Sequence, residues 1–182
     1  MALDLVELAT CTRCELSLTR RRVVVGSGRA RPALVVVGEA PGRHEDEGGE
    51  PFVGRSGQLF FRVLEEEVGL TRDDCFVTNV VKCRPPNNRT PSRVEIATCR
   101  PWLLGQLASV APAAVVTLGN TAARAVFGLV HGVSVTHGQL HWVGTSRGLV
   151  TYHPAAALRG GARVLDVMRD DLRMLNDLVG RP

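Results

Sequence analysis

The chain has 182 residues and a mass of 19.6 kDa, which is the length of one ordinary domain and is sufficient to bury a core. Hydrophobic residues make up 45% of it and charged residues 22%, which excludes disordered and collagen-like chains. The net charge is +4, and Lys82 is the one lysine among 22 basic residues. There is no apolar run of ~18 residues and no basic leader. We therefore expect a soluble, intracellular, cytoplasmic protein with no membrane partner.

Taken in chain order, four short apolar runs rich in β-branched residues predict buried strands at 33–37, 75–81, 114–118 and 148–152. Helical patterns separate or follow them at 57–68, from a capping box at 92–95 through Leu107, at 120–127 and at 163–178. Residues 133–143 predict a small hairpin or an irregular connection. This alternation predicts a single domain over 1–182, a three-layer α/β/α sandwich with a central, mostly parallel four-stranded sheet.

The loop after the first predicted strand, 38–54, is rich in glycine and proline and carries the carboxylates Glu39 and Glu45 and the aromatic ring of Phe52. In parallel sheets, functional residues gather beyond the carboxyl ends of the strands. The loop lacks the endings that bind nucleotide phosphates, so nucleotide cofactors are disfavoured. Taken alone, Phe52 is typical of a core residue and Glu39 of a solvated or capping carboxylate.

Two further strands also end in polar groups. Asn79 lies in the second predicted strand, where its amide must be paired, either within the protein or by a ligand with a donor and an acceptor. His153 follows the fourth strand, before Pro154, which stops the strand, and a Leu-Arg-Gly-Gly tip that precedes the last predicted helix. An amide, an imidazole, a carboxylate and an aromatic ring at neighbouring strand ends predict a binding site.

The cysteines indicate a metal centre, because a reducing compartment disfavours disulfides. A Cys-x-x-Cys pair can chelate one centre, and two further cysteines complete a possible set of four: Cys11, Cys14, Cys83 and Cys99. Their spacing does not distinguish tetrahedral zinc from an iron–sulfur cluster. Cys75 lies in a predicted strand and is expected to be the spare.

Four segments in order resemble the family 4 uracil-DNA glycosylases, the iron–sulfur branch of that superfamily: GEAPGRHEDEGGEPFVGRSGQ, TNVVKCRPPNNRTPS, CRPWL and YHPAAALR. The resemblance extends from Cys11 to the last predicted helix. It implies hydrolysis of the bond between uracil and deoxyribose in DNA, which leaves an abasic site for base excision repair. It also implies a structural 4Fe-4S cluster bound by Cys11, Cys14, Cys83 and Cys99. This cluster would tie the N-terminal segment to the loop and helix after the second strand.

The resemblance also implies roles for individual residues. Phe52 stacks on the flipped uracil, Asn79 reads its amide edge, and His153 donates to O2 as negative charge builds on the leaving base. Backbone groups line the remainder of the pocket at Glu39, Ala40 and Pro41.

The group that activates water has two candidates. Many uracil-DNA glycosylases outside this branch carry an aspartate where this chain has Ala40. Glu39 is therefore the first candidate and Asn87 the second. Glu45 is a candidate for filling the space that a thymine methyl group would need.

The implied DNA contacts lie on two loops. Leu158 would enter the gap left by the flipped nucleotide. Phosphate contacts are expected from Arg84, Arg89, Arg159 and Arg163. The preference for arginine over lysine can also reflect coding base composition alone.

We expect a monomer acting on single- or double-stranded uracil-containing DNA. Two other hypotheses are a zinc-bound nucleic-acid module and a protein that traps uracil-DNA covalently. The trapping relative uses a histidine in an arginine-rich insertion before its Thr-Pro-Ser segment, and Asn88 and Arg89 stand there in this chain without such an insertion.

Overall fold

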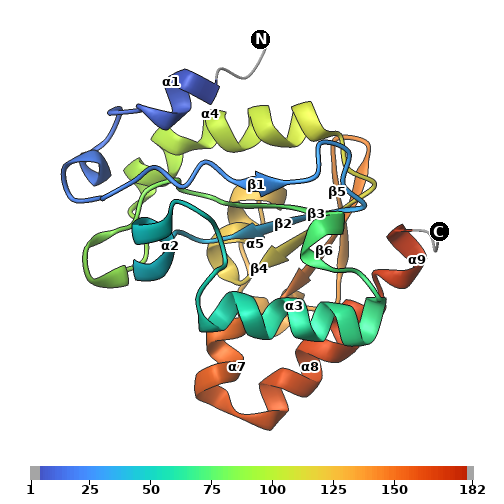
Figure 1. The fold of residues 1–182 in the computed structure, drawn as a ribbon. Helices are drawn as coiled ribbons and strands as arrows, with labels where there is room; N and C mark the ends of the chain where they lie inside the picture. Colours follow the sequence, from blue (N-terminus) through green and yellow to red (C-terminus); the bar gives the residue numbers. More distant parts are fainter. Residues whose placement is uncertain (1–4, 180–182) are drawn as a thin grey trace.

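Six strands form one sheet in the order β1-β3-β2-β4-β6-β5, in a computed structural model that describes residues 5–179 (Figure 1). The strands are β1 (Ser27–Gly28), β2 (Leu34–Gly38), β3 (Cys75–Asn79), β4 (Ala114–Leu118), β5 (Leu140–Val143) and β6 (Ser146–Thr151). The central strands β3, β2, β4 and β6 are parallel, as predicted. The short antiparallel edge strands β1 and β5 extend the predicted four-stranded sheet to six.

Helices flank the sheet on both faces. They are α1 (Leu5–Ala9), α2 (Arg43–Gly48), α3 (Arg55–Val68), α4 (Arg93–Val110), α5 (Asn120–Phe127), α6 (Val133–Thr136), α7 (Pro154–Gly160), α8 (Ala162–Arg173) and α9 (Asn176–Val179). Short 3-10 turns lie at η1 (Glu15–Leu18), η2 (Arg72–Asp74) and η3 (Pro86–Asn88). Among residues 5–179, none of the helices is long and apolar enough to cross a membrane.

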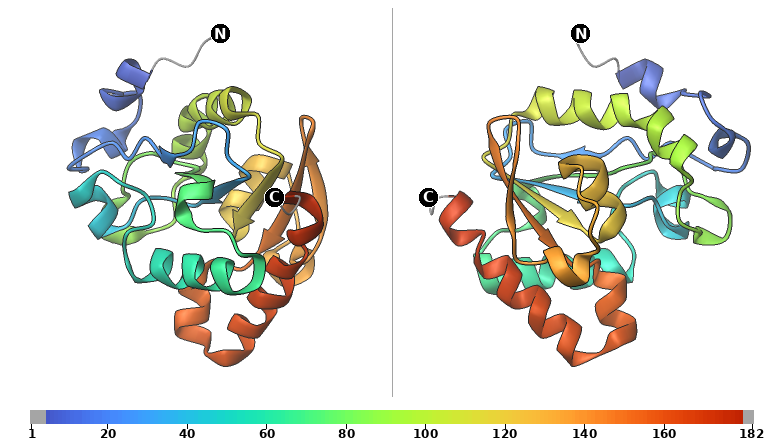
Figure 2. Two further views of the ribbon diagram at one scale, coloured as in Figure 1. Left: turned by 45° about the vertical axis from the view of Figure 1, so that its right-hand side comes forward. Right: turned by 180° about the vertical axis from the view of Figure 1, so that it is seen from behind.

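Alternate residues of β2 pack into two separate cores. Leu34 and Val36 lie in the core under α3, α7 and α8, whereas Val35 and Val37 lie in the core under α4 and α5. Because successive side chains of a strand point to opposite faces, a continuous apolar run is what a strand buried on both faces requires. Figures 1 and 2 show α3, α7 and α8 together on one side of the sheet and α4 on the other. The predicted three-layer sandwich is confirmed.

The register brings the carboxyl ends of the parallel strands to one edge. Gly38 at the end of β2 pairs with Asn79 at the end of β3, and Leu118 pairs with Thr151 at the ends of β4 and β6. The loops that follow these four strands therefore converge.

The second strand is shorter than predicted, because β3 ends at Asn79 rather than Val81. The amides of Val80 and Val81 donate to the carbonyls of Gly38 and Glu39, at 2.9 and 3.2 Å, outside the regular ladder. Both valines are buried, so the apolar run continues past the end of the strand. Asn79 is consequently the last residue of β3, at the carboxyl edge of the sheet, and not an interior residue of the strand.

The segment after His153, for which the pattern predicts no helix of its own, forms the helix α7, and the Leu-Arg-Gly-Gly tip lies at its end. His153 is the N-cap of α7 and Pro154 occupies its first turn, so the His-Pro pair that ends the strand also starts a helix. The predicted helix at 163–178 is also divided, because α8 ends at Arg173 and α9 follows. The Ser92–Glu95 capping box of α4 is confirmed.

The segment after β4 differs in two details. Gly119, and not Asn120, is the N-cap of α5, while the Asn120 side chain accepts from the Val133 amide at 2.6 Å. The segment at 133–143, expected as a small hairpin or an irregular connection, folds as α6 followed by the edge strand β5, which pairs antiparallel with β6.

Gly57 gives a test of how α3 positions the loop before it. A Cβ at Gly57 would lie 1.8 Å from the carbonyl oxygen of Phe52. Gly57→Ala should therefore lower the free energy of unfolding by about 1–3 kcal/mol, measured by denaturant titration. Gly48→Ala is the control, because a Cβ there meets nothing within 4 Å. Equal stability of the two variants would contradict this packing.

Candidate functional site

The loop between β2 and α3 is held by two carboxylates. Glu45 accepts from the amides of Gly42 and Gly54 at 3.0 and 2.9 Å, so it joins the two ends of the loop. Asp46 is buried and accepts from the Arg21 amide at 2.9 Å, which ties the loop to the N-terminal segment. We did not predict Asp46, because nothing in the sequence near it indicates a partner so distant along the chain.

Phe52 has a backbone conformation that is unusual for a residue with a side chain. Its φ is 57°, in the left-handed region, which costs about 1–3 kcal/mol unless the surroundings enforce it. The ring is 7% exposed and lies over Gly38, where a Cβ would stand 2.6 Å from Cε2 of Phe52 and 2.5 Å from Oδ1 of Asn79. Strain of this kind is typical of functional sites and favours more than a packing role for Phe52.

Asn79 is 2% exposed, and its Oδ1 has no hydrogen-bond partner in the part of the chain that the structure describes. Leaving a buried acceptor unsatisfied costs about 1–3 kcal/mol. A structural asparagine would be paired. The unpaired amide oxygen therefore favours the hypothesis that Asn79 binds a ligand.

His153 lies beside these two groups as a neutral donor. Its Nδ1 accepts from the Ala155 amide at 3.1 Å, which leaves the proton on Nε2. Burial is the main reason that the pKa of His153 is lowered to about 4; the charge of Arg159 acts in the same direction and that of Glu45 opposes it. The imidazole ring is 6.0 Å from the Phe52 ring, centroid to centroid. At neutral pH, His153 can donate through Nε2 without carrying a charge.

Glu39, the first residue after β2, is partly buried and accepts a hydrogen bond from the Thr121 hydroxyl on α5. Thr121 was not among the predicted site residues, because its link to Glu39 arises only when β2 and α5 meet. Ala40 is partly buried and Pro41 buried next to it. Asn87 is exposed on η3 with φ 55°, and the structure does not join it to the other site residues.

The end of α7 forms an exposed projection. Leu158 is 44% exposed in its last turn, and Arg159 and Arg163 are exposed beside it. An exposed leucine followed by exposed arginines has the composition expected of a wedge that enters DNA.

The two arginines of the predicted basic loop are already engaged. Arg84 donates to the Asn88 side chain at 2.7 Å. Arg89 makes a double contact with Glu95, at 2.6 and 2.8 Å, and this pairing lowers the pKa of Glu95 to about 2. Arg89 thus offers DNA a charge that Glu95 largely compensates.

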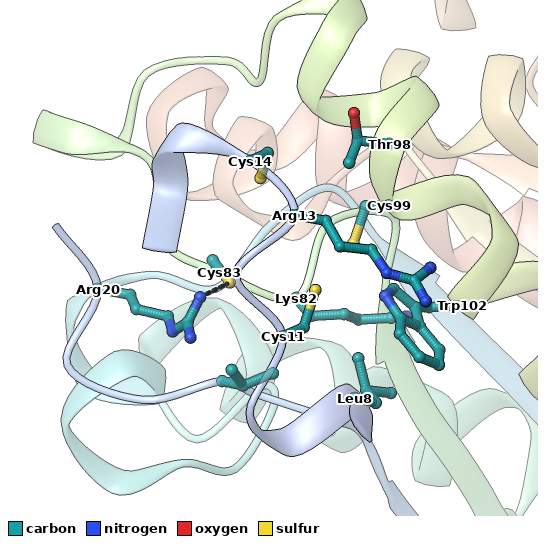
Figure 3. Close-up of a pocket in the computed structure, with 11 residues that line it drawn as sticks. Leu8, Cys11, Arg13, Cys14, Arg20, Lys82, Cys83, Thr98, Cys99 and Trp102 are labelled. Carbon is teal, nitrogen blue, oxygen red and sulfur yellow. Dashed lines mark hydrogen bonds between the residues drawn. The ribbon is translucent and has the colours of Figure 1, made fainter. Parts of the chain in front are cut away.

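The four cysteines predicted to bind metal line one pocket (Figure 3): Cys11, Cys14, Cys83 and Cys99. Arg20 donates to the Cys83 sulfur at 3.3 Å. Within residues 5–179, no group of three or more ligating side chains has the arrangement for a single ion. An iron–sulfur cluster takes one thiolate on each of its four irons. Its four ligands can therefore lie farther apart than the ligands of a single metal ion. The donor chemistry of the pocket fits such a cluster.

Cys75 is separate from this pocket. It lies at the start of β3 in the other core, and its thiol donates to the Thr71 carbonyl at 3.3 Å. Burial raises the pKa of Cys75 to about 12 and that of Cys83 to about 11, although Arg20 acts to lower the latter. A bound cluster would supply positive charge that favours the thiolate form of Cys83.

Comparison with known proteins assigns this chain to a family. The sequence model described as "Uracil DNA glycosylase superfamily" matches residues 25–175. A type-4 uracil-DNA glycosylase of Thermotoga maritima is 43% identical over 85% of this chain and 81% of its own length. One of Saccharolobus solfataricus is 38% identical over 96% and 85%. A type-5 enzyme of Pyrobaculum aerophilum is 31% identical over 81% and 79%. The chain belongs to the uracil-DNA glycosylase superfamily, in its type-4 family.

The cysteine pocket leads to a paired prediction. Cys83→Ser should give colourless protein with a lowered thermal midpoint, because one thiolate ligand is lost. Cys75→Ser should keep the visible absorbance and iron content of the unaltered protein. Iron analysis and absorbance after anaerobic purification test both variants. Equal iron in the two would remove Cys83 from the ligand set.

The lowered pKa of His153 leads to a prediction for stability. Below its ordinary pKa of 6.5 the unfolded chain takes up a proton, whereas the folded chain stays neutral until about pH 4. The stabilisation is therefore complete above pH 6.5 and is lost as pH falls toward 4. His153→Asn, which keeps an N-cap acceptor, should flatten the fall in the free energy of unfolding across this window. Parallel profiles for the two proteins would contradict the assignment.

Proposed function

We propose that this protein excises uracil from DNA by hydrolysing the N-glycosidic bond, leaving an abasic site as the first step of base excision repair. The observation that carries the proposal is the buried amide oxygen of Asn79, which has no partner among the described residues and lies with the Phe52 ring over Gly38. Family membership supports it, because the matched relatives are named as uracil-DNA glycosylases.

Recognition follows from the polarity of the base edge. The Asn79 Oδ1 accepts from the N3–H of uracil while its amide nitrogen donates to O4. Cytosine presents an acceptor and a donor at these positions, in the reverse order, and so leaves the buried amide unsatisfied. Phe52 supplies the stacking surface for the flipped base.

Bond cleavage places negative charge on the departing uracil. His153 donates from Nε2 to O2, which stabilises this charge most strongly in the transition state. The neutral imidazole is suited to this role. Its Nδ1 accepts a hydrogen bond from the Ala155 amide, so its one ring proton is on Nε2, which faces the base in this proposal. Backbone groups of Glu39, Ala40 and Pro41 form the wall of the uracil pocket.

Water activation is assigned to Glu39. Its carboxylate lies at the strand end and is oriented by Thr121, and it can both orient water and stabilise the cationic sugar. Asn87 is the second candidate for assisting water, should its exposed loop close on DNA. Glu45 occupies the loop beside the pocket and is proposed to exclude the thymine methyl group.

DNA contacts are assigned to the end of α7. Leu158 replaces the stacking of the flipped nucleotide, and Arg159 and Arg163 contact phosphates. Arg84 and Arg89 are proposed as further phosphate contacts from the loop before α4. The protein acts as a monomer on uracil in single- or double-stranded DNA.

The cofactor is proposed to be a 4Fe-4S cluster held by Cys11, Cys14, Cys83 and Cys99. When bound, the cluster supplies a cross-link between segments distant in sequence rather than a chemical step. It would join the N-terminal segment to the loop and helix after β3, so that residues 1–182 act as one domain.

The test is release of uracil from a uracil-containing oligonucleotide, followed by alkali to cut abasic sites. The loaded protein should release uracil and leave a matched thymine oligonucleotide intact. Asn79→Ala should slow excision by several orders of magnitude while keeping its cluster absorbance. Asn176→Ala, a control in α9, should be unaffected. No uracil release by the loaded protein would overturn the proposed function.

A further inference from the structure

Lys82, the single lysine of the chain, has no part in the mechanism above. It is 1% exposed and lines the cysteine pocket with Cys83 and Cys99 (Figure 3). A lysine is almost never fully buried unless its hydrogen bonds are satisfied and its charge is compensated. The contacts of Lys82 must therefore compensate for its burial.

The ammonium group uses all three of its donors. Its Nζ donates to the Thr78 hydroxyl at 2.7 Å, the backbone carbonyl of Asn79 at 2.6 Å and the Gln106 side-chain oxygen at 2.7 Å. Gln106 is itself held, because its amide nitrogen donates to the Val25 carbonyl at 2.6 Å. The group is thus fixed between β3 and α4.

Lys82 also belongs to the wall of the cysteine pocket. All three acceptors of its Nζ are neutral, and in the described residues Nζ has no contact with a carboxylate. Lys82 directly precedes Cys83 in the chain and lines the pocket together with Cys83 and Cys99. Lys82 thereby joins the cysteine pocket to the peptide of Asn79.

We propose that Lys82 is a positioning residue that holds the Asn79 peptide so that the amide of Asn79 faces uracil, and that it couples this peptide to the cysteine pocket. The inference rests on the proposed function, because it concerns how the base-reading amide is held. Since Oδ1 of Asn79 has no partner among the described residues, its position depends on the backbone. A displacement of 1 Å in a reacting group can cost about 10²-fold in rate.

A double-mutant cycle separates this role from general support of the fold. Single-turnover excision is measured for the unaltered protein, Lys82→Met, Asn79→Ala and the double variant, each normalised to its iron content. Lys82→Met alone should slow excision by about 10²-fold. In the Asn79→Ala background it should change the rate by less than roughly threefold, because the residue on which it acts is gone. Affinity for a thymine-containing duplex should be unchanged.

Gln106→Leu is the matched control. It removes one of the three acceptors and the Val25 anchor but leaves the bond from Lys82 to the Asn79 carbonyl. It should slow excision by less than about tenfold, even where its thermal midpoint falls as far as that of Lys82→Met. Equal loss in both variants would assign the effect to the buried network as a whole and overturn the proposal.

Other outcomes are also decisive. Equal slowing by Lys82→Met in both backgrounds, or no slowing, would overturn the role of Lys82 while leaving uracil excision intact. An unaltered, loaded protein that releases no uracil would overturn the proposed function instead. If Lys82→Met does not fold, Lys82→Gln replaces it in the cycle. Failure of both to fold would show that Lys82 supports the whole fold, which also overturns the proposal.

Discussion

The pairing of Gly38 with Asn79, at the ends of two adjacent parallel strands, is the constraint on which the site depends. The Phe52 ring and the Asn79 amide meet above Gly38 at distances that leave no room for a Cβ. A shift of one residue in register would turn Asn79 to the opposite face of the sheet, away from Phe52. The amide and the ring that we propose to read and stack the base are therefore positioned by the same ladder of backbone hydrogen bonds that builds the sheet.

The charged groups around this point are hydrogen-bonded. Glu45 and Asp46 hold the loop after β2, and Lys82 donates to β3 and α4. The Asn79 Oδ1, in contrast, has no partner among the described residues. In the proposed function, bonded surroundings make the site rigid and this acceptor provides selectivity, because a base with the wrong edge cannot satisfy it.

Patterning identified the main elements and failed where tertiary contacts override it. The four central strands and α3, α4 and α5 follow from apolar runs and caps that are local in sequence. The end of β3 was misplaced because Val80 and Val81 are buried beyond the sheet. The helix α7 was missed because the same His-Pro pair that ends a strand also begins a helix.

The sequence by itself determined the parallel sheet, the candidate groups at its strand ends and the four thiols, because each leaves a local pattern of residue types. Only the tertiary structure decided which candidates meet: Phe52, Asn79 and His153 converge, Asn87 stays apart, and Arg89 is compensated by Glu95. The hydrogen bonds of Thr121 with Glu39 and of Asp46 with Arg21 likewise could not be predicted from the sequence. The physical reason is that hydrogen bonds and ion pairs join residues far apart in sequence, and no local periodicity records them.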